Sequence, residues 1–157
     1  MVSETAKKLV LLTLQLSGGV METDTRMQKL AFLVNQVLNW AKFEANDYGP
    51  YSKELTKAVD ELEKEGKLVY VWGDDGMSIL DDGVSRYFLK EKGKREARRV
   101  LEQLKYDELK RVTEIVQTHK DDPLTYLLAY IYKYYPEYAE KSKIRSKVEE
   151  WIRYFNP

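Results

Sequence analysis

The chain has 157 residues, enough for one domain or for a small module with an appended helical part. Its 26 Lys and Arg balance its 26 Asp and Glu, whereas a protein whose main role is to coat nucleic acid is usually basic. The absence of cysteine excludes a disulfide scaffold and cysteine-based zinc sites, and the Lys- and Glu-rich composition favours a thermophile. Because neither a signal-peptide pattern nor an apolar run of membrane-span length is present, we expect a soluble cytoplasmic protein with no membrane partner.

The first part of the chain predicts two helices separated by a short strand. A helix over about 4–17 follows Ser3, a residue type that caps helices, and stops at a Gly-Gly pair. Residues 20–21 are expected as a strand. The second helix, about 25–42, is apolar over more than a third of its circumference, so we expect it near the centre of the fold.

A turn and a third helix follow. The YGPY sequence at 48–51 cannot continue a helix, because Pro50 lacks an amide donor and disfavours helical geometry at Gly49. Ser52 is expected to cap a new helix, and Gly66 to end it.

A β-hairpin is predicted next. The runs 69–72 and 77–80 are β-type, and the GDDG sequence at 73–76 joins them as the tip. A helix that runs through glycine into a two-stranded ribbon is the second half of a winged helix-turn-helix.

Beyond residue 80 the sequence predicts helices. A basic helix is expected over 86–99, where seven Lys and Arg face two Glu, with Gly93 breaking or bending it. Asp122 is expected to cap a helix that begins at Pro123, and Ser142 to cap the last helix. The expected fold class is therefore mainly α with a small β-hairpin (α+β): a winged helix-turn-helix over 1–90 and a C-terminal helical extension over 91–157 packed on it.

Three motifs stand out: MQKLAFLV at 27–34, YGPYSKEL at 48–55, and LAYIY at 128–132 followed by YPE at 135–137. In this order they resemble the YwgA-like proteins and their relatives, the Panacea antitoxin domains, over most of the chain. The resemblance implies a winged-helix core and, from the Panacea domains, neutralisation of a toxin by protein contact. The ribbon and LDDG at 80–83 also resemble the wing end of PadR- and MarR-type repressors, where L-T-x-x-G is usual and Asp81 here replaces the Thr.

Catalytic machinery is not evident. The only histidine, His119, is expected at a helix C-terminus or on the surface rather than at a catalytic centre. The Asp pairs at 74–75, 81–82 and 121–122 are expected to serve turns and helix starts rather than a metal. Since no phosphate loop, nucleophile elbow or HExxH motif occurs, we expect no enzyme, no metal ligands and no cofactor.

A DNA-binding hypothesis rests on the third helix, whose N-terminal residues would enter the major groove. The electrostatics oppose it, because 51–66 carries three Lys against five acidic residues, and the acidic pair at 74–75 would meet phosphates. The expected DNA contacts are Tyr51, Ser52, Lys53, Thr56 and Lys57, with Arg86 and Lys90 from the basic stretch.

A protein-binding hypothesis rests on the C-terminal tyrosines. Tyr126, Tyr130 and Tyr134 share one face of a predicted helix, and tyrosine is enriched at interfaces. This face predicts a homodimer through the C-terminal helices or a site for a partner such as a toxin; an intramolecular core is the alternative.

Two hypotheses result. The first is a non-enzymatic winged-helix protein that binds double-stranded DNA, as a homodimeric transcriptional regulator. The second is a protein-interaction module of the antitoxin-like kind that does not bind DNA.

Overall fold

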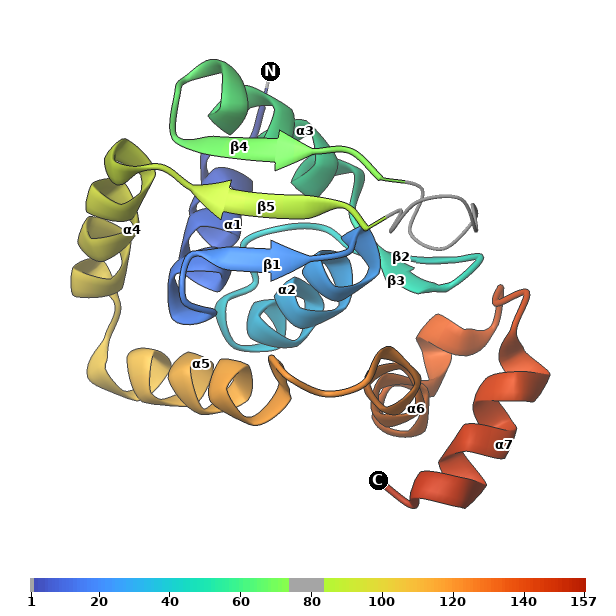
Figure 1. Cartoon of the computed structure of the whole chain (residues 1–157). Helices are drawn as coiled ribbons and strands as arrows, with labels where there is room; N and C mark the ends of the chain where they lie inside the picture. Colours follow the sequence, from blue (N-terminus) through green and yellow to red (C-terminus); the bar gives the residue numbers. More distant parts are fainter. Residues whose placement is uncertain (1, 74–83) are drawn as a thin grey trace.

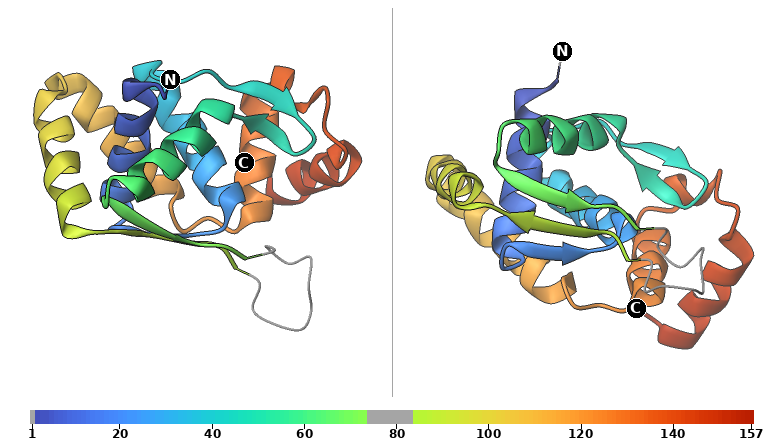
Figure 2. Two further views of the ribbon diagram at one scale, coloured as in Figure 1. Left: turned by 90° about the horizontal axis from the view of Figure 1, so that it is seen from above. Right: turned by 45° about the horizontal axis from the view of Figure 1, so that its top comes forward.

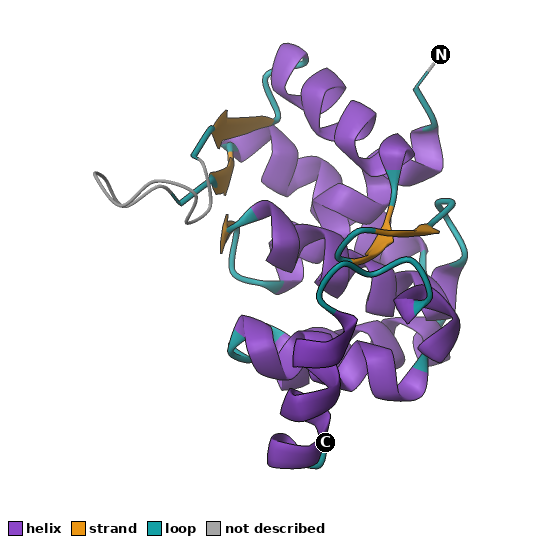
Figure 3. Cartoon of the chain, turned by 90° about the vertical axis from the view of Figure 1, so that its right-hand side faces the viewer, coloured by secondary structure: helices purple, strands orange, loops and turns teal. Residues whose placement is uncertain are grey.

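The computed structural model describes residues 2–73 and 84–157, and its first elements follow the order of a winged helix (Figure 1). These elements are α1 (Glu4–Leu16), β1 (Val20–Glu22), α2 (Asp24–Leu38), α3 (Lys53–Lys64), β4 (Leu68–Val71) and β5 (Arg86–Leu89). A separate ribbon of β2 (Glu44–Asn46) and β3 (Gly49–Tyr51) lies between α2 and α3. The rest is helical: α4 (Glu91–Gln103), α5 (Tyr106–His119), α6 (Leu124–Tyr134), the 3-10 turn η1 (Pro136–Ala139) and α7 (Arg145–Phe155). The mainly α fold class with a small β part is confirmed, and Figure 3 shows the strands as two small patches among helices.

The core is built around α1 and α2. Ser3 caps α1, with its hydroxyl oxygen accepting the Ala6 amide at 3.2 Å, and α1 then buries Leu9 and Leu12 completely. Along α2, Leu30 and Phe32 are also fully buried. This burial confirms the central position predicted for the second helix.

The second helix ends at Leu38, four residues earlier than predicted. Asn39 takes a left-handed conformation with φ of 54°, which Asn tolerates better than most residues. The Asn35 carboxamide oxygen then accepts the amides of Trp40, at 2.7 Å, and Ala41, at 3.0 Å. Because this side chain satisfies the amides after the turn, the chain leaves the helix there without losing hydrogen bonds.

The three-stranded sheet has the order β1-β5-β4 and is antiparallel throughout. The predicted first hairpin strand is confirmed as β4, but the described strand that pairs with it is β5. The prediction of a helix from residue 86 is therefore wrong for Arg86–Leu89, where Tyr87 and Leu89 point into the core and Phe88 is exposed. The predicted partner strand 77–80 and residues 74–76 of the predicted tip lie outside the described residues.

Gly93 does not break a helix, since α4 runs through it. A Cβ atom at this position would lie 2.1 Å from the Lys67 carbonyl oxygen. The glycine therefore allows α4 to approach the turn before β4 closely. From there α4 packs along α1.

Helices α6 and α7 lie at the opposite end of the molecule from α4, and α5 runs from one end toward the other (Figures 1 and 2). Helix α5 packs on α2, and α6 contacts both α2 and α7.

Two predicted caps are wrong. Asp122 does not cap α6; it lies 2.7 Å from the His119 ring, and Pro123 precedes the first residue of the helix. Ser142 hydrogen-bonds Tyr132 at 2.7 Å, three residues before α7 begins.

Candidate functional site

Two adjacent side chains of α2 hold the turn that leads into α3. The Gln28 carboxamide brackets Ser52, because its oxygen accepts the Ser52 amide at 2.8 Å and its nitrogen donates to the Ser52 carbonyl at 3.1 Å. The Lys29 ammonium donates to the Pro50 carbonyl at 3.0 Å. Gly49 has φ of 92°, and a Cβ there would lie 2.9 Å from a Tyr132 ring carbon. The three motifs found in the sequence, at 27–34, 48–55 and 128–132, therefore meet at this turn.

Lys29 is buried to an unusual degree for an amine. Its exposed fraction is 4%, and the described structure provides it with a carbonyl acceptor but no carboxylate. Burial lowers the pKa of its ammonium to about 8, because an apolar environment disfavours the charged form. Lys29 lies within the MQKLAFLV motif at 27–34, but the motif did not indicate that this side chain would be buried against the turn before α3.

The residues predicted to contact DNA are only partly available to do so. Lys53, Thr56 and Lys57 are exposed on the first turns of α3. The Tyr51 hydroxyl is hydrogen-bonded to the Thr56 hydroxyl at 2.8 Å. Ser52 is completely buried as the N-cap of α3, with its hydroxyl oxygen accepting the Leu55 amide, so its side chain faces no partner molecule.

The other predicted contacts, Arg86 and Lys90, lie apart from the start of α3. Arg86 is on the outer face of the sheet, 4.0 Å from Glu22. Lys90 follows β5, and its amide donates to the carbonyl of Lys67, just beyond the C-terminal end of α3. The structure thus brings five of the seven predicted residues together at the start of α3, with Ser52 buried among them, and leaves the basic residues of α4 near the other end of α3.

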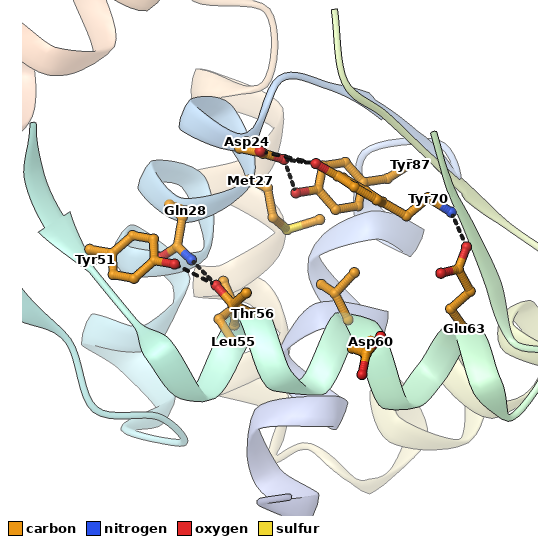
Figure 4. A pocket seen from close by; sticks show the side chains of 11 residues that line it. Asp24, Met27, Gln28, Tyr51, Leu55, Thr56, Asp60, Glu63, Tyr70 and Tyr87 are labelled. Carbon is orange, nitrogen blue, oxygen red and sulfur yellow. Dashed lines mark hydrogen bonds between the residues drawn. The ribbon is translucent and has the colours of Figure 1, made fainter. Parts of the chain in front are cut away.

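A pocket of about 280 Å³ lies beside α3, between this helix, α2 and the inner face of the sheet (Figure 4). We call it the tyrosine pocket, because three of its lining residues are tyrosines from different elements. Its described lining residues are Asp24, Met27, Gln28, Tyr51, Leu55, Thr56, Val59, Asp60, Glu63, Tyr70 and Tyr87.

Hydrogen bonds fix the polar wall of the tyrosine pocket. The Asp24 carboxylate accepts the hydroxyls of Tyr87, at 2.5 Å, and Tyr70, at 3.0 Å (Figure 4). The Tyr70 backbone amide in turn donates to Glu63 at 3.0 Å. With Asp60, the pocket therefore has three carboxylates beside the face of α3 that would lie nearest to DNA.

The outer face of the sheet is apolar and exposed. The register places Val20, Phe88 and Val69 side by side across the three strands. In Figures 1 and 2 the described helices lie behind this sheet and leave its outer face uncovered. Its apolar side chains are exposed to solvent by the following fractions: Val20 49%, Val69 38%, Val71 45%, Phe88 37%, and Trp72, just beyond β4, 74%.

The C-terminal tyrosines make contacts within the chain. Tyr126 packs edge-on against Phe155 of α7, and Tyr130 packs against His119 and Tyr134. Tyr134 is nevertheless half exposed, and the pKa of Tyr130 is raised by its burial. His119 ends α5, which confirms the predicted helix C-terminus, and its side chain is buried.

The fold and this arrangement of surfaces define the class of the molecule as a winged helix-turn-helix protein with added C-terminal helices. Within residues 2–73 and 84–157 no group of three or more acidic, His or Cys side chains is arranged to hold a metal, and no helix is long and apolar enough to cross a membrane. No protein-family model matches the chain, and comparison with characterised proteins finds no match either.

Two features of the candidate surfaces were not predicted from the sequence. The Asp24, Tyr70 and Tyr87 cluster joins positions far apart in the chain, so no local pattern indicates it. The apolar outer face depends on the pairing of β5 with both neighbours. The alternation of RYFL at 86–89 was the available signal, but it is only four residues long and borders a basic helix.

Proposed function

We propose that this chain is a non-enzymatic winged-helix module that binds another protein through the outer face of its sheet, and that it does so in the cytoplasm. The observation that carries the proposal is the exposed row of Val20, Phe88 and Val69, with Val71 and Trp72 beside it. Exposed apolar patches of this kind mark protein interaction sites. Glu22 and Arg86 border the row and pair with each other across it at 4.0 Å. The lack of cysteine agrees with a reducing compartment.

Electrostatics support a protein partner over duplex DNA. DNA binding draws on several cationic contacts with phosphates. Beside the exposed Lys53 and Lys57, the tyrosine pocket places Asp24, Asp60 and Glu63. These carboxylates would repel phosphates on the same side of the molecule.

A site-specific photocrosslinker tests the proposal. We would replace Phe88 by benzoylphenylalanine in cells of the source organism, with the same change at Tyr106, a 78% exposed residue of α5, as the matched control. We expect one protein to be crosslinked from position 88 and not from 106.

The partner identified in this way must then bind the purified chain. Because an aromatic residue at the centre of an interface often dominates affinity, Phe88→Lys should weaken binding by about tenfold or more. Equal crosslinking from both positions, or equal affinity of the wild type and the lysine variant, would contradict the proposal.

Duplex DNA binding is the second candidate function. The specific observation in its favour is that Lys53 and Lys57 are exposed on the first turns of α3, the part of a winged helix that enters the major groove. A duplex titration separates the two candidates, because only the second requires strong binding that depends on these two lysines.

A further inference from the structure

The tyrosine pocket has a charge that selects for cations. Asp24, Asp60 and Glu63 line it, and none of its described lining residues is basic. Asp60 also pairs with Lys64 at 3.1 Å, but that pair is exposed and contributes little. An anionic ligand would therefore be repelled, and a cationic one attracted.

The polar groups of the pocket face a ligand mainly as acceptors. The hydroxyl hydrogens of Tyr70 and Tyr87 are directed to Asp24, and the Gln28 amide hydrogens to Ser52 and Thr56. An incoming group therefore meets the carboxylate and tyrosine side chains that line the pocket. An ammonium group has three N–H donors and no acceptor, so it suits these surroundings.

The remaining walls favour an organic cation over a metal ion. Met27, Leu55 and Val59 supply apolar side chains, which solvate a hydrocarbon stem but not a hydrated metal. Aromatic rings attract an alkylammonium through the cation–π interaction. Among the described residues, the carboxylates are not gathered as metal ligands would be.

We propose that the tyrosine pocket is a binding site for an alkylammonium group on an aliphatic stem. The group could come from a free diamine or from a lysine side chain of another protein. The site lies on the inner side of the sheet, so it is independent of the outer face proposed above to bind a protein.

Two-dimensional NMR of the whole chain tests the site. The probes are 1,5-diaminopentane, n-butylamine, methylammonium and Nα-acetyl-lysine methylamide, each as the chloride at fixed ionic strength. We expect saturable shifts for the pocket residues, with affinity rising from methylammonium to butylamine because the stem covers the apolar wall. Comparable affinity for blocked lysine and the free diamine would indicate a protein lysine; binding of the free diamine alone would indicate a small molecule.

A charge-matched pair of variants makes the test specific. Asp60→Asn with Glu63→Gln removes two exposed pocket carboxylates, while Glu102→Gln with Glu150→Gln removes two exposed carboxylates of α4 and α7. We expect the pocket variant to lose about tenfold in affinity and the control variant to keep it. The proposal is overturned if no amine binds saturably, if methylammonium binds as well as butylamine, or if both double variants lose affinity equally.

Discussion

Lys29 has the lowered pKa of a catalytic lysine, but its contacts give it a structural role. An amine with a pKa near 8 resembles an activated catalytic lysine, yet its ammonium donates to the Pro50 carbonyl and so holds the turn before α3. Keeping this charge buried lowers the stability of the fold. The hydrogen bond to Pro50 offsets part of that cost.

The first prediction is a gain in stability at alkaline pH. The pKa of Lys29 is about 8 in the folded chain against 10.5 for an ordinary lysine, so the unfolded chain binds more protons between these values. Stability therefore rises with pH through this window, and the destabilising effect is fully present below pH 8. From pH 7 to pH 10 we expect a gain of about 2 kcal/mol relative to Lys29→Met, measured by urea unfolding of both proteins. In the variant the Pro50 carbonyl loses its donor, and this loss of stability is the same at every pH. If the plots of stability against pH for the two proteins ran parallel, the prediction would therefore be contradicted.

The second prediction concerns the close approach of Gly49 to Tyr132. Gly18 and Gly49 have almost the same positive φ, 90° and 92°, but a Cβ at Gly18 would meet no atom within 4 Å. Alanine at either position introduces backbone strain of about 1 kcal/mol, and only at Gly49 does it also displace the Tyr132 ring. We expect Gly49→Ala to cost about 1–3 kcal/mol more than Gly18→Ala by thermal and urea unfolding. Equal losses would mean that the ring moves freely.

At the scale of elements, several local features were predictable, although the caps at Asp122 and Ser142 were not, and the pairing of strands was not predicted. Ser3 and Ser52 cap their helices as expected, and Gly66 has the left-handed φ of 75° that a helix-ending glycine adopts. The pairing of β4 with β5 was not predicted, because strand pairing depends on residues distant in sequence. The candidate sites were not predicted for the same reason: they combine residues that are distant in sequence. The motif containing Lys29 was visible in the sequence, whereas its contact with Pro50 depends on the packing of α2 against the turn.

An ion-pair network around Glu65 joins α1, the turn between α3 and β4, and α4, and it gives the third prediction. Glu65 lies 2.9 Å from Lys7 of α1 and 3.0 Å from Lys67, which in turn lies 2.6 Å from Glu96 of α4. The Lys7 hydrogen bond, followed by that of Lys67, lowers the pKa of Glu65. A lowered carboxyl pKa stabilises the fold at neutral pH, and this stabilisation is lost as pH falls through the folded value.

Glu65→Gln should therefore destabilise the chain by about 1 kcal/mol at pH 7, a modest value because the group is partly exposed. The difference from wild type should shrink in acid, below the usual carboxyl pKa of about 4.3. Glu102→Gln, an exposed change on α4, serves as the control and should have little effect in urea unfolding at either pH. A Glu65 effect that stays constant with pH would rule out the ion pairs as its cause.

Self-association is a property of the whole molecule, and the fourth prediction addresses it. The C-terminal helices were predicted to form a homodimer, and their exposed aromatic residues include Tyr134 at 51% and Tyr154 at 82%. If that surface dimerises, light scattering should give a dimer mass at high micromolar concentration. Tyr154→Lys should lower the dimer fraction, and Tyr106→Lys, at an equally exposed site on α5, should not. A monomeric mass throughout would leave the outer face of the sheet as the main interaction surface.

The balance of charge over the whole molecule gives the last prediction. A net charge of zero, with acidic groups of the tyrosine pocket beside α3, should leave duplex binding weak and confined to low salt. The weak duplex binding that remains at low salt should come from Lys53 and Lys57. Their replacement by alanine should then reduce the slope of log K against log salt by about two units, roughly one for each lost phosphate contact. Fluorescence anisotropy with a labelled duplex at several salt concentrations measures this slope. Tight binding at about 150 mM salt that the double variant abolishes would favour the DNA-binding function, because screening at that ionic strength removes weak, non-specific attraction.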